Sequence, residues 1–557
     1  MIIPRIKKCI KQESVFKGNL IFDTTEDVSK KAVDLLTLFL PGLIFRVDKS
    51  SNVIFKKEAL KKGGYKLNIT TDKIFISYAD DEGVRNAVAT LVQLINDNKI
   101  KCCLIDDEPD NEFRSCLLDL ARGYVEISVL KEHIVRMALL KFNYVHLHLM
   151  DRQSYVLESS VFPNPDKHRL YSKNEIRELL NFCKALSIEV IPEIEIPAHA
   201  VNQIKALPEL SCEIDDIQGA LEQIRSIDNP RKREFTDALK GISTWVVCAG
   251  KESTYQIYEN LIVEICELFD GEYLHIGGDE LSFEHLGAYC YWDNCICCKK
   301  RMKEEGLSNT RELYYYLVKR MYRIVKNQGK KMIMWNDQIN SFDETDIPKD
   351  IVLEFWNDHA SGTNKGNCQR LLNQGYKIIN AHYRYTYVDF PEYMQENNIN
   401  KWHTRLDFLD EKELCGNIMG GEMCAWNLGD PLFSFYPYSL PVCMTLFADR
   451  VWNDEDTDYN EEYKKAIFSI ITGKFNVGIN PFTYFQELIP PHDINKCMVE
   501  SVDFEKINFK ELNETIEQIK LIDKNKIYGK IALGAYIQCI ETIECILSEK
   551  QYRGEVV

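Results

Sequence analysis

Eight short apolar runs, separated mostly by segments of helical periodicity, occupy the stretch from Phe113 to Trp452. The runs are continuously apolar instead of alternating, as in parallel strands that are buried on both faces. They are SCLLDLA, NYVHLHLM, IEVIPEIEI, EYLHIGG, KMIMWND, IVLEFWN, YKIINAH and NIMGGEMCAW. Eight strands with intervening helices within roughly 340 residues predict an α/β fold of the (β/α)8, or TIM barrel, type, with an open doubly wound sheet as the alternative.

The regions on either side of the barrel predict two smaller units. Alternating apolar residues at 65–70 and 73–79 indicate neighbouring strands, and residues 82–97 have helical spacing. Residues 509–525 and 528–550 have the pattern of amphipathic helices. We therefore expect a small α/β domain at residues 1–110, the barrel at 111–453 and a C-terminal helical appendage at 454–557.

Composition limits the partners of the chain. With 68 basic and 85 acidic residues among 557, the net charge of −17 disfavours nucleic acid and anionic membranes as partners. We also expect no membrane span, because no run of ~18 apolar residues occurs. The 19 cysteines, in a chain whose first residues lack an apolar signal segment, predict reduced thiols and a cytoplasmic location.

Polar and aromatic side chains gather where the predicted strands end, and in a barrel the carboxyl ends of the strands carry the active site. These residues are Arg122, Asp151, Glu195, His199, Asp279, Glu280, Trp335, Asp337, Trp356, Tyr387, Asp389 and Trp426. Flat aromatic faces beside hydrogen-bonding carboxylates suit a sugar, which has apolar C–H faces and a rim of hydroxyls. The set therefore indicates a glycosidase.

The adjacent carboxylates Asp279 and Glu280 are the centre of this set. Neighbours within a strand point to opposite faces, so both reach one pocket only if the strand ends there. Gly277 and Gly278 allow the backbone to turn at that point. Two carboxylates in one site raise one pKa by mutual repulsion, which keeps one group protonated as an acid. A pair in a solvated loop is the alternative, and the preceding apolar strand disfavours it.

The motif HIGGDE resembles the signature of glycoside hydrolase family 20, the β-N-acetylhexosaminidases. The segments LLDLARGYVEIS, IEVIPEIEIPAHA, YTYVDF, MGGEMCAW and LFADRVW also resemble the family and occur in its order, and residues 63–95 are similar to its small domain before the barrel. The resemblance covers residues 15–453. It implies an exo-acting, retaining enzyme whose substrate is a carbohydrate with a terminal β-linked GlcNAc or GalNAc.

The resemblance also implies substrate-assisted catalysis, in which the substrate's own 2-acetamido oxygen attacks the anomeric carbon to form an oxazolinium intermediate. Glu280 would be the general acid, Asp279 would orient the acetamido N–H, and Tyr387 would hydrogen-bond the acetamido oxygen. Asp151 and His199 would form a relay behind Glu280. Sugar contacts would come from Arg122, Trp335, Trp356, Asp389 and Trp426. The mechanism requires no cofactor and no metal.

The chain departs from the family pattern near the end of the last strand. Leu428 stands where the family has a glutamate that binds the O4 region of the sugar. We therefore expect relaxed discrimination between GlcNAc and GalNAc, unless Asp430 or Glu422 compensates. Glu195 also replaces a usual aspartate. A disaccharide-releasing relative and a sugar-binding protein without turnover are the alternative functions.

Two groups of residues resemble metal ligands. His146 and His148 share one face of a predicted strand, where packing is the favoured interpretation. Cys295 and Cys298 have C-x-x-C spacing, and with Cys290 they would hold zinc if a fourth ligand such as His285 approached. Because the spacing is not that of a standard zinc finger, reduced surface thiols are favoured.

Overall fold

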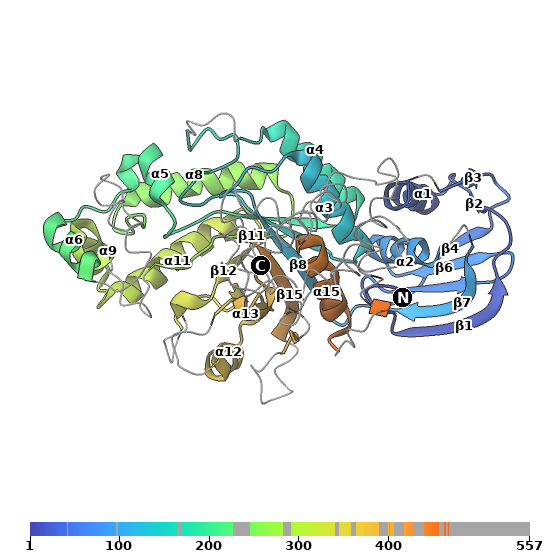
Figure 1. Ribbon diagram of the computed structural model, residues 1–557. Coiled ribbons are helices and arrows are strands. Elements are labelled where there is room, and N and C mark those ends of the chain that lie inside the picture. Colours follow the sequence, from blue (N-terminus) through green and yellow to red (C-terminus); the bar gives the residue numbers. More distant parts are fainter. Residues whose placement is uncertain are drawn as a thin grey trace, which may run out of the picture.

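The computed structural model describes most of the chain up to residue 455. The described ranges are 1–41, 43–95, 99–163, 170–226, 245–281, 291–339, 345–357, 364–388, 401–405, 417–426 and 439–455, with the single positions 399, 462, 463 and 466. The helices expected at residues 509–525 and 528–550 therefore lie outside the described residues. Figure 1 shows a barrel flanked on one side by a smaller sheet domain, which contains the N-terminus.

Eight parallel strands close into a barrel in the order β10-β11-β12-β13-β14-β15-β8-β9. They are β8 (Phe113–Asp119), β9 (Tyr144–His148), β10 (Glu189–Glu193), β11 (Tyr273–His275), β12 (Lys331–Trp335), β13 (Val352–Phe355), β14 (Lys377–Asn380) and β15 (Ile418–Ala425). Each of the eight predicted runs supplies one strand. The barrel prediction is confirmed, and the open-sheet alternative is wrong.

Helices surround the barrel and connect its strands (Figure 1). They are α3 (Ile127–Leu139), α4 (Lys173–Ala185), α5 (Val201–Ala206), α6 (Ile217–Ser226), α8 (Glu252–Leu268), α9 (Tyr291–Asn294), α10 (Ile296–Glu305), α11 (Thr310–Asn327), α12 (Asn364–Asn373), α13 (Tyr383–Thr386) and α15 (Ser439–Asn453), with 3₁₀ turns η2 (Pro208–Leu210) and η4 (Asp337–Ile339). Local sequence signals determine where helices begin; at α4, for example, Ser172 and Glu175 form a capping box. No helix among the described residues has both the length and the apolar character needed to cross a bilayer.

The N-terminal domain contains a five-stranded sheet in the order β1-β7-β5-β6-β4. Its elements are β1 (Lys8–Val15), β4 (Val53–Lys57), β5 (Tyr65–Ile69), β6 (Ile74–Tyr78), β7 (Lys101–Asp107) and helix α2 (Asp81–Leu94), beside α1 (Asp27–Phe39) and the pair β2 (Leu20–Phe22) and β3 (Phe45–Val47). The predicted neighbouring strands β5 and β6 pair antiparallel, and the predicted helix is α2. Strand β1 was not predicted.

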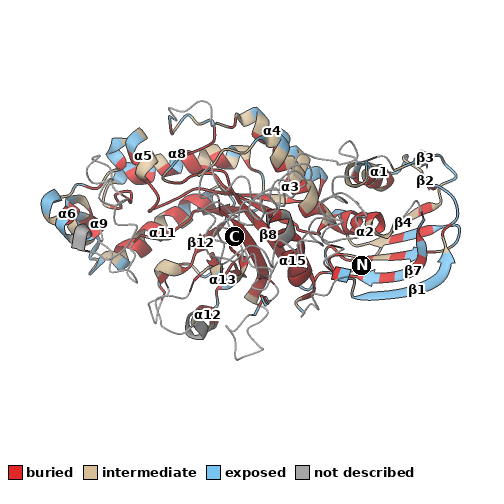
Figure 2. Ribbon diagram, in the orientation of Figure 1, coloured by how far each residue is buried: buried red, intermediate tan, exposed pale blue. Residues whose placement is uncertain are grey.

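Helix α2 lies between this sheet and the barrel helix α3 (Figure 1). Buried charges fasten it there: Glu82 forms an ion pair with Arg114 of β8, and Arg85 donates to the carbonyl oxygen of Phe142 at 2.5 Å. Figure 2 shows buried residues continuing from the barrel through α2, whereas the edge strand β1 is exposed. The small domain is thus packed on the barrel through α2.

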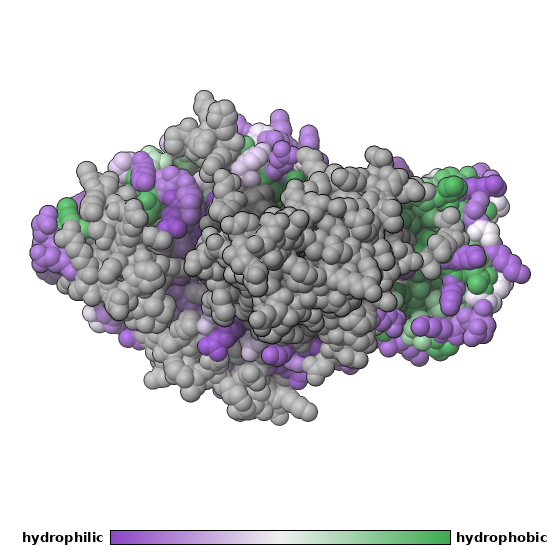
Figure 3. Space-filling view, viewed as in Figure 1, coloured by the Kyte–Doolittle hydropathy of each residue, from purple (hydrophilic) through white to green (hydrophobic). Residues whose placement is uncertain are grey.

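The outer face of the five-stranded sheet carries a row of exposed apolar side chains. Ile10 of β1 pairs with Leu104 of β7, and Phe75 of β6 lies farther along the same row. Figure 3 shows hydrophobic side chains among hydrophilic ones at this end of the molecule. The sheet therefore buries its inner face and leaves a mixed face to solvent.

The interior of the barrel is layered. One apolar residue from each strand forms a plug near the amino ends, a set of eight: Phe113, Tyr144, Ile191, Tyr273, Ile333, Val352, Ile379 and Met419. Histidine and glutamate side chains form the next layer. An aromatic cluster follows near the carboxyl ends, around Trp335, Tyr387 and Trp426. The barrel is therefore closed at one end, and its functional groups gather at the other.

Candidate active site

The carboxyl ends of the strands bring the predicted site residues together. Arg122 follows β8, Asp151 follows β9, His199 follows β10, Asp279 and Glu280 follow β11, Trp335 ends β12, Trp356 follows β13, Tyr387 follows β14 and Trp426 follows β15. Ion pairs and ring contacts between these side chains join them into one group. Asp389, the remaining predicted residue, lies outside the described residues.

A turn after β11 presents both carboxylates to this end of the barrel. Gly277 and Gly278 have φ angles of +68° and +94°, and Glu280 has +49°. A Cβ at Gly277 would lie 2.1 Å from Oε2 of buried Glu195, so any other residue there would have to displace Glu195 and adopt a strained backbone. The side chains of Asp279 and Glu280 remain 15% and 13% exposed, which leaves both accessible to a substrate.

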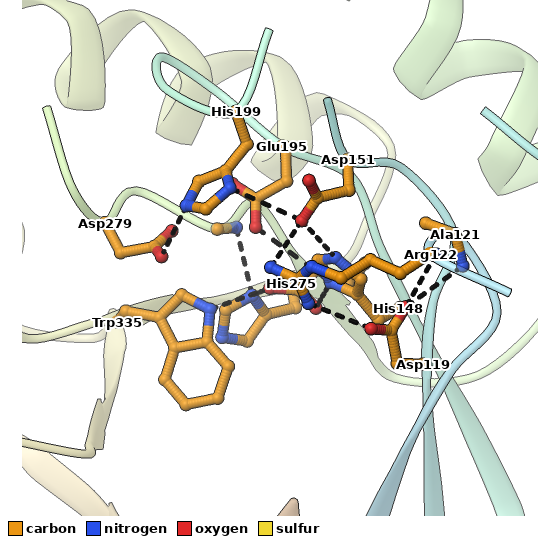
Figure 4. Close-up of polar contacts among 12 residues, drawn as sticks. Asp119, Ala121, Arg122, His148, Asp151, Glu195, His199, His275, Asp279 and Trp335 are labelled. Carbon is orange, nitrogen blue, oxygen red and sulfur yellow. Dashed lines mark hydrogen bonds and ion pairs between the residues drawn. The ribbon is translucent and has the colours of Figure 1, made fainter. Parts of the chain in front are cut away.

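His199 bridges the adjacent carboxylates to a deeper one, and Figure 4 shows its contacts with Asp279 and Asp151. Its Nε2 lies 3.2 Å from Oε2 of Glu280 and 3.4 Å from Oδ2 of Asp279, and its Nδ1 lies 3.3 Å from Oδ2 of Asp151. Burial disfavours the charged ring, but Asp151 and Asp279 outweigh it and raise the pKa of His199 well above its usual value. The imidazole is therefore a positive charge between Asp151 and the Asp279–Glu280 pair.

Asp151 is held by Arg122 as well as by histidines. Nη2 of Arg122 lies 2.6 Å from Oδ2 of Asp151, and its Nη1 lies 2.9 Å from Oδ2 of Asp119 (Figure 4). Burial opposes ionisation, yet Arg122 and His199 hold the pKa of Asp151 well below its usual range. The Arg122 guanidinium also lies over the ring of Trp426, 4.9 Å from its centroid. This arginine thus connects the ionic group to the aromatic group.

The aromatic residues form a continuous group beside the carboxylates. The rings of Trp356 and Tyr387 stack with centroids 6.1 Å apart, and Trp426 lies 5.8 Å from Tyr387 and 6.0 Å from Trp335. Trp335 is only 1% exposed and donates its indole N–H to Glu193 at 2.8 Å. It therefore lies beneath the group, whereas Trp356 is half-buried.

Asp337 is a third carboxylate close to the pair. The sequence placed it at a strand end without assigning it a role. Its Oδ2 accepts from the backbone N–H of Glu280 at 3.0 Å, and its Oδ1 accepts from the indole of Trp356 at 3.1 Å. Burial, followed by the charge of Asp279, raises the pKa of Asp337 to about 7. Asp337 thus supports the turn that carries Glu280.

Two residues that contact this turn were missed by sequence reasoning. Trp245 donates its indole N–H to the carbonyl oxygen of Glu280 at 3.1 Å, and its ring lies 4.8 Å from that of His199. The hydroxyl of Tyr314 in α11 donates to the carbonyl oxygen of Gly278 at 2.6 Å. Tyr314 belongs to the buried face of a predicted helix, and Trp245 lies outside every predicted strand or helix, so no local pattern indicated either contact.

An ionic layer lies directly below the site. His146 contacts Glu422 at 2.8 Å and Glu193 at 3.3 Å, and His148 pairs with Glu193. Burial lowers the basicity of these histidines, but the carboxylates outweigh it and raise the pKa to about 10 for His146 and about 9 for His148. Packing was expected for both; they are in fact paired with buried glutamates.

The position of Glu422 corrects one expectation. Glu422 was considered as a replacement for the missing O4 carboxylate, but its side chain is fully buried and faces His146 inside the barrel. It does not reach a sugar at the carboxyl end. Leu428 and Asp430 lie outside the described residues.

Several described groups bring three or four potential metal ligands within 4.8 Å of one another. Most are the His–Glu sets of the ionic layer and the set His199, Asp279 and Glu280 at the active site. The remaining group consists of four buried cysteines outside the active site: Cys212, Cys248, Cys295 and Cys298.

Comparisons with known proteins agree with this geometry. The family model for the catalytic domain of glycosyl hydrolase family 20 matches residues 111–427, and that for domain 2 of the same family matches residues 2–108. A beta-hexosaminidase of Porphyromonas gingivalis is 29% identical over 303 residues, which are 50% of this chain and 36% of the relative. A beta-hexosaminidase of Vibrio furnissii is 28% identical over 370 residues, which are 62% of this chain and 56% of the relative. The chain thus spans about a third and about half of the lengths of these two relatives.

Solved structures share the fold. The exo beta-N-acetylglucosaminidase of Vibrio harveyi, in complex with N-acetylglucosamine, has a TM-score of 0.71 at 21% identity, covering 85% of this chain and 77% of that one. The beta-N-acetylhexosaminidase of Bacteroides fragilis has a TM-score of 0.68 at 24% identity. The match covers 84% of this chain and 94% of that one. The family model matches more than half of the chain and ends where the site ends, just after Trp426. The chain therefore belongs to glycosyl hydrolase family 20.

Proposed function

We propose that the chain is an exo-acting, retaining β-N-acetylhexosaminidase that removes terminal β-linked GlcNAc or GalNAc from oligosaccharides or glycoconjugates. The observation that carries the proposal is the Asp279–Glu280 pair, bridged by His199 to buried Asp151 and placed beside the aromatic group. Relatives named beta-hexosaminidase and the Vibrio harveyi structure with bound N-acetylglucosamine support the same activity.

In the proposed reaction, Glu280 protonates the glycosidic oxygen and later activates water. The substrate's acetamido oxygen displaces the leaving group, and the resulting oxazolinium ion is then hydrolysed with retention of configuration. Asp279 receives the acetamido N–H and stabilises the positive charge that develops there. Tyr387 donates to the acetamido oxygen and holds it in near-attack geometry. No side chain of the protein serves as nucleophile.

The neighbouring groups set the charge and shape of the site. Protonated His199 lies within 3.4 Å of both carboxylates, so it offsets their mutual repulsion and influences the ionisation of Glu280. Arg122 and the proposed contact from Asp389 hold the hydroxyls, and the tryptophans pack on the apolar faces of the acetamido group and the ring. Leu428 gives no hydrogen bond to O4, which supports acceptance of both epimers.

A cytoplasmic location remains a proposal. It is supported by the cysteines of the described residues, none of which forms a disulfide: Cys9, Cys102, Cys103, Cys116, Cys183, Cys212, Cys248, Cys266, Cys295, Cys297, Cys298, Cys368, Cys424 and Cys443.

Hydrolysis of a chromogenic β-N-acetylglucosaminide and its GalNAc epimer tests the proposal. We expect turnover of both substrates and a loss of ~10²-fold or more in Glu280→Gln, the usual scale for losing a general acid. Glu272→Gln is the matched control, because Glu272 is a half-exposed carboxylate at the opposite end of β11. Binding without hydrolysis would indicate a sugar-binding protein, and release of disaccharides from an oligosaccharide panel would indicate the alternative enzyme.

A further inference from the structure

Four cysteines from three separate segments meet away from the active site. Cys212 follows η2, Cys248 precedes α8, and Cys295 and Cys298 lie at the start of α10. All four are buried, and their Sγ atoms lie within 4.8 Å of one another. The Sγ atom of Cys248 is 3.6 Å from that of Cys295 and 3.7 Å from that of Cys298. We call this group the thiol cluster.

The spacing of these sulfurs matches a tetrahedral metal site. A disulfide requires an S–S distance of about 2.05 Å, far shorter than either measured separation. In a tetrahedron with Zn–S bonds of about 2.3 Å, neighbouring sulfurs lie about 3.8 Å apart. The two sulfur–sulfur separations that involve Cys248, 3.6 and 3.7 Å, are close to that edge length, and all the sulfurs lie within 4.8 Å of one another. Four thiols and no other ligand type favour zinc among the metals.

The backbone holds the three segments in place around the cluster. Ile296 N–H donates to the carbonyl oxygen of Glu213 at 2.9 Å, which joins the segment of Cys212 to that of Cys295. Gly250 packs so closely on α10 that an added Cβ would lie 2.2 Å from the backbone of Cys297. The sulfurs are therefore brought together by a backbone framework, as a preformed site requires.

Positive charge lies close to the cluster. A zinc ion with four thiolates carries a net charge of about −2, which needs compensation in a buried position. Nζ of Lys251 donates to the carbonyl oxygen of Ser211, adjacent to Cys212, at 2.9 Å. Nε of Arg301 donates to the carbonyl oxygen of Gly250 at 3.4 Å. Both cations also pair with carboxylates, Lys251 with Glu213 at 3.0 Å and Arg301 with Glu252 at 3.0 Å, so only part of their charge is available to the cluster.

We propose that Cys212, Cys248, Cys295 and Cys298 bind one structural Zn²⁺ ion. Four cysteine ligands fill the coordination sphere and leave no position for water, so this ion takes no part in the chemistry. The site goes beyond the hexosaminidase activity and does not depend on it. The sequence spacing had indicated Cys295 and Cys298, with Cys290 and His285 as the other candidate ligands. Cys290 and His285 lie outside the described residues, and the structure places Cys212 and Cys248 beside the pair instead.

The zinc ion would connect the two loops that carry the catalytic histidine and the carboxylates. Cys248 lies three residues after Trp245, which contacts both His199 and the carbonyl oxygen of Glu280. Cys295 follows Trp292, whose indole N–H donates to the carbonyl oxygen of Val247 at 2.9 Å. The metal would thus fix the segment after β10 against the segment after β11.

Elemental analysis of the full-length protein, purified without chelator, tests the proposal. We expect one equivalent of zinc in the wild type, stoichiometric zinc in Cys297→Ser, and loss of zinc in Cys298→Ser. Cys297 is the matched control, because it is the neighbouring, half-buried cysteine and does not belong to the cluster. Wild-type protein without zinc, iron in its place, or equal loss from both variants would overturn the assignment.

A second measurement remains decisive if Cys298→Ser fails to fold. Wild-type protein produced with Co²⁺ should show the thiolate-to-cobalt charge-transfer bands and d–d bands of a tetrahedral CoS₄ centre. Intact-protein mass spectrometry should find the four cluster thiols reduced and one metal bound. Absence of thiolate–cobalt bands, or a disulfide between cluster cysteines, would refute the site even if the enzyme is fully active.

Discussion

Replacing Gly277 by alanine tests the turn that presents the two carboxylates. Gly277 has a φ of +68°, and a Cβ there would lie 2.1 Å from Oε2 and 2.6 Å from Cδ of Glu195. Glu195 is buried, and its Oε1 lies 3.9 Å from Nδ1 of His148, so moving it away from the new Cβ would disturb its packed surroundings. The substitution therefore combines backbone strain with a collision in the core.

The two contributions can be separated with a matched variant. The left-handed conformation costs a non-glycine residue about 1–2 kcal/mol. Displacing the packed Glu195 adds about 1–3 kcal/mol, so the free energy of unfolding should fall by about 2–5 kcal/mol in all. Gly329 has a φ of +74° with nothing within 4 Å of its Cβ position, so Gly329→Ala should lose the first contribution alone.

Urea unfolding followed by tryptophan fluorescence, together with kcat/KM on a chromogenic substrate, measures both effects. Gly277→Ala should be less stable than Gly329→Ala by about 1–3 kcal/mol. It should also lose activity, because the turn carries Asp279 and Glu280, whereas Gly329 precedes β12 at the other end of the barrel. Equal stability of the two variants, with full activity in both, would refute the collision and the role of the turn.

Three further predictions concern the groups around this turn. The pKa of Asp337 is raised from 3.8 in the unfolded chain to about 7 in the folded protein, so between these pH values the folded protein keeps a proton that the unfolded chain has lost. The protonated Asp337 therefore contributes its full stabilisation below about pH 4, and this stabilisation is lost as the pH rises through 7. The stability of wild type relative to Asp337→Asn should therefore fall by up to about 4 kcal/mol across that window, and parallel pH curves would contradict this. Trp245→Phe removes the donor to the carbonyl oxygen of Glu280, so stability should fall by about 1 kcal/mol and kcat should fall more than KM changes; an unchanged kcat would speak against it. Asp151→Asn should destabilise the fold by about 3–5 kcal/mol and lower the pKa of His199, moving the alkaline limb of the kcat/KM profile to lower pH; an unmoved limb would exclude the coupling.

The barrel could be predicted because its signal is local. Strands buried on both faces read as continuous apolar runs, and all eight runs became barrel strands. Strand β1 (Lys8–Val15) has the opposite character, since nearly all of its residues are exposed and several are charged or polar. It is a strand because it pairs with β7, some ninety residues away, and that partner leaves no local pattern in the sequence.

The active site was predictable where its residues end strands. Asp279 and Glu280 stand next to a double glycine, a signal that one segment contains by itself. Contacts with segments more than thirty residues away determine the positions of other groups, namely Trp245, Cys212 and Cys248. Periodicity and spacing report only neighbours along the chain, so these groups emerge only once the loops after β10 and β11 are packed together.

The dependence of kcat/KM on fluorine in the substrate's N-acyl group tests the central claim most directly. Each fluorine on the acetyl methyl withdraws electron density from the carbonyl oxygen that acts as the nucleophile. We predict that kcat/KM falls steeply and progressively from N-acetyl through monofluoro- and difluoro- to trifluoroacetyl glucosaminides. A flat series would contradict substrate assistance and would require a nucleophile from the protein.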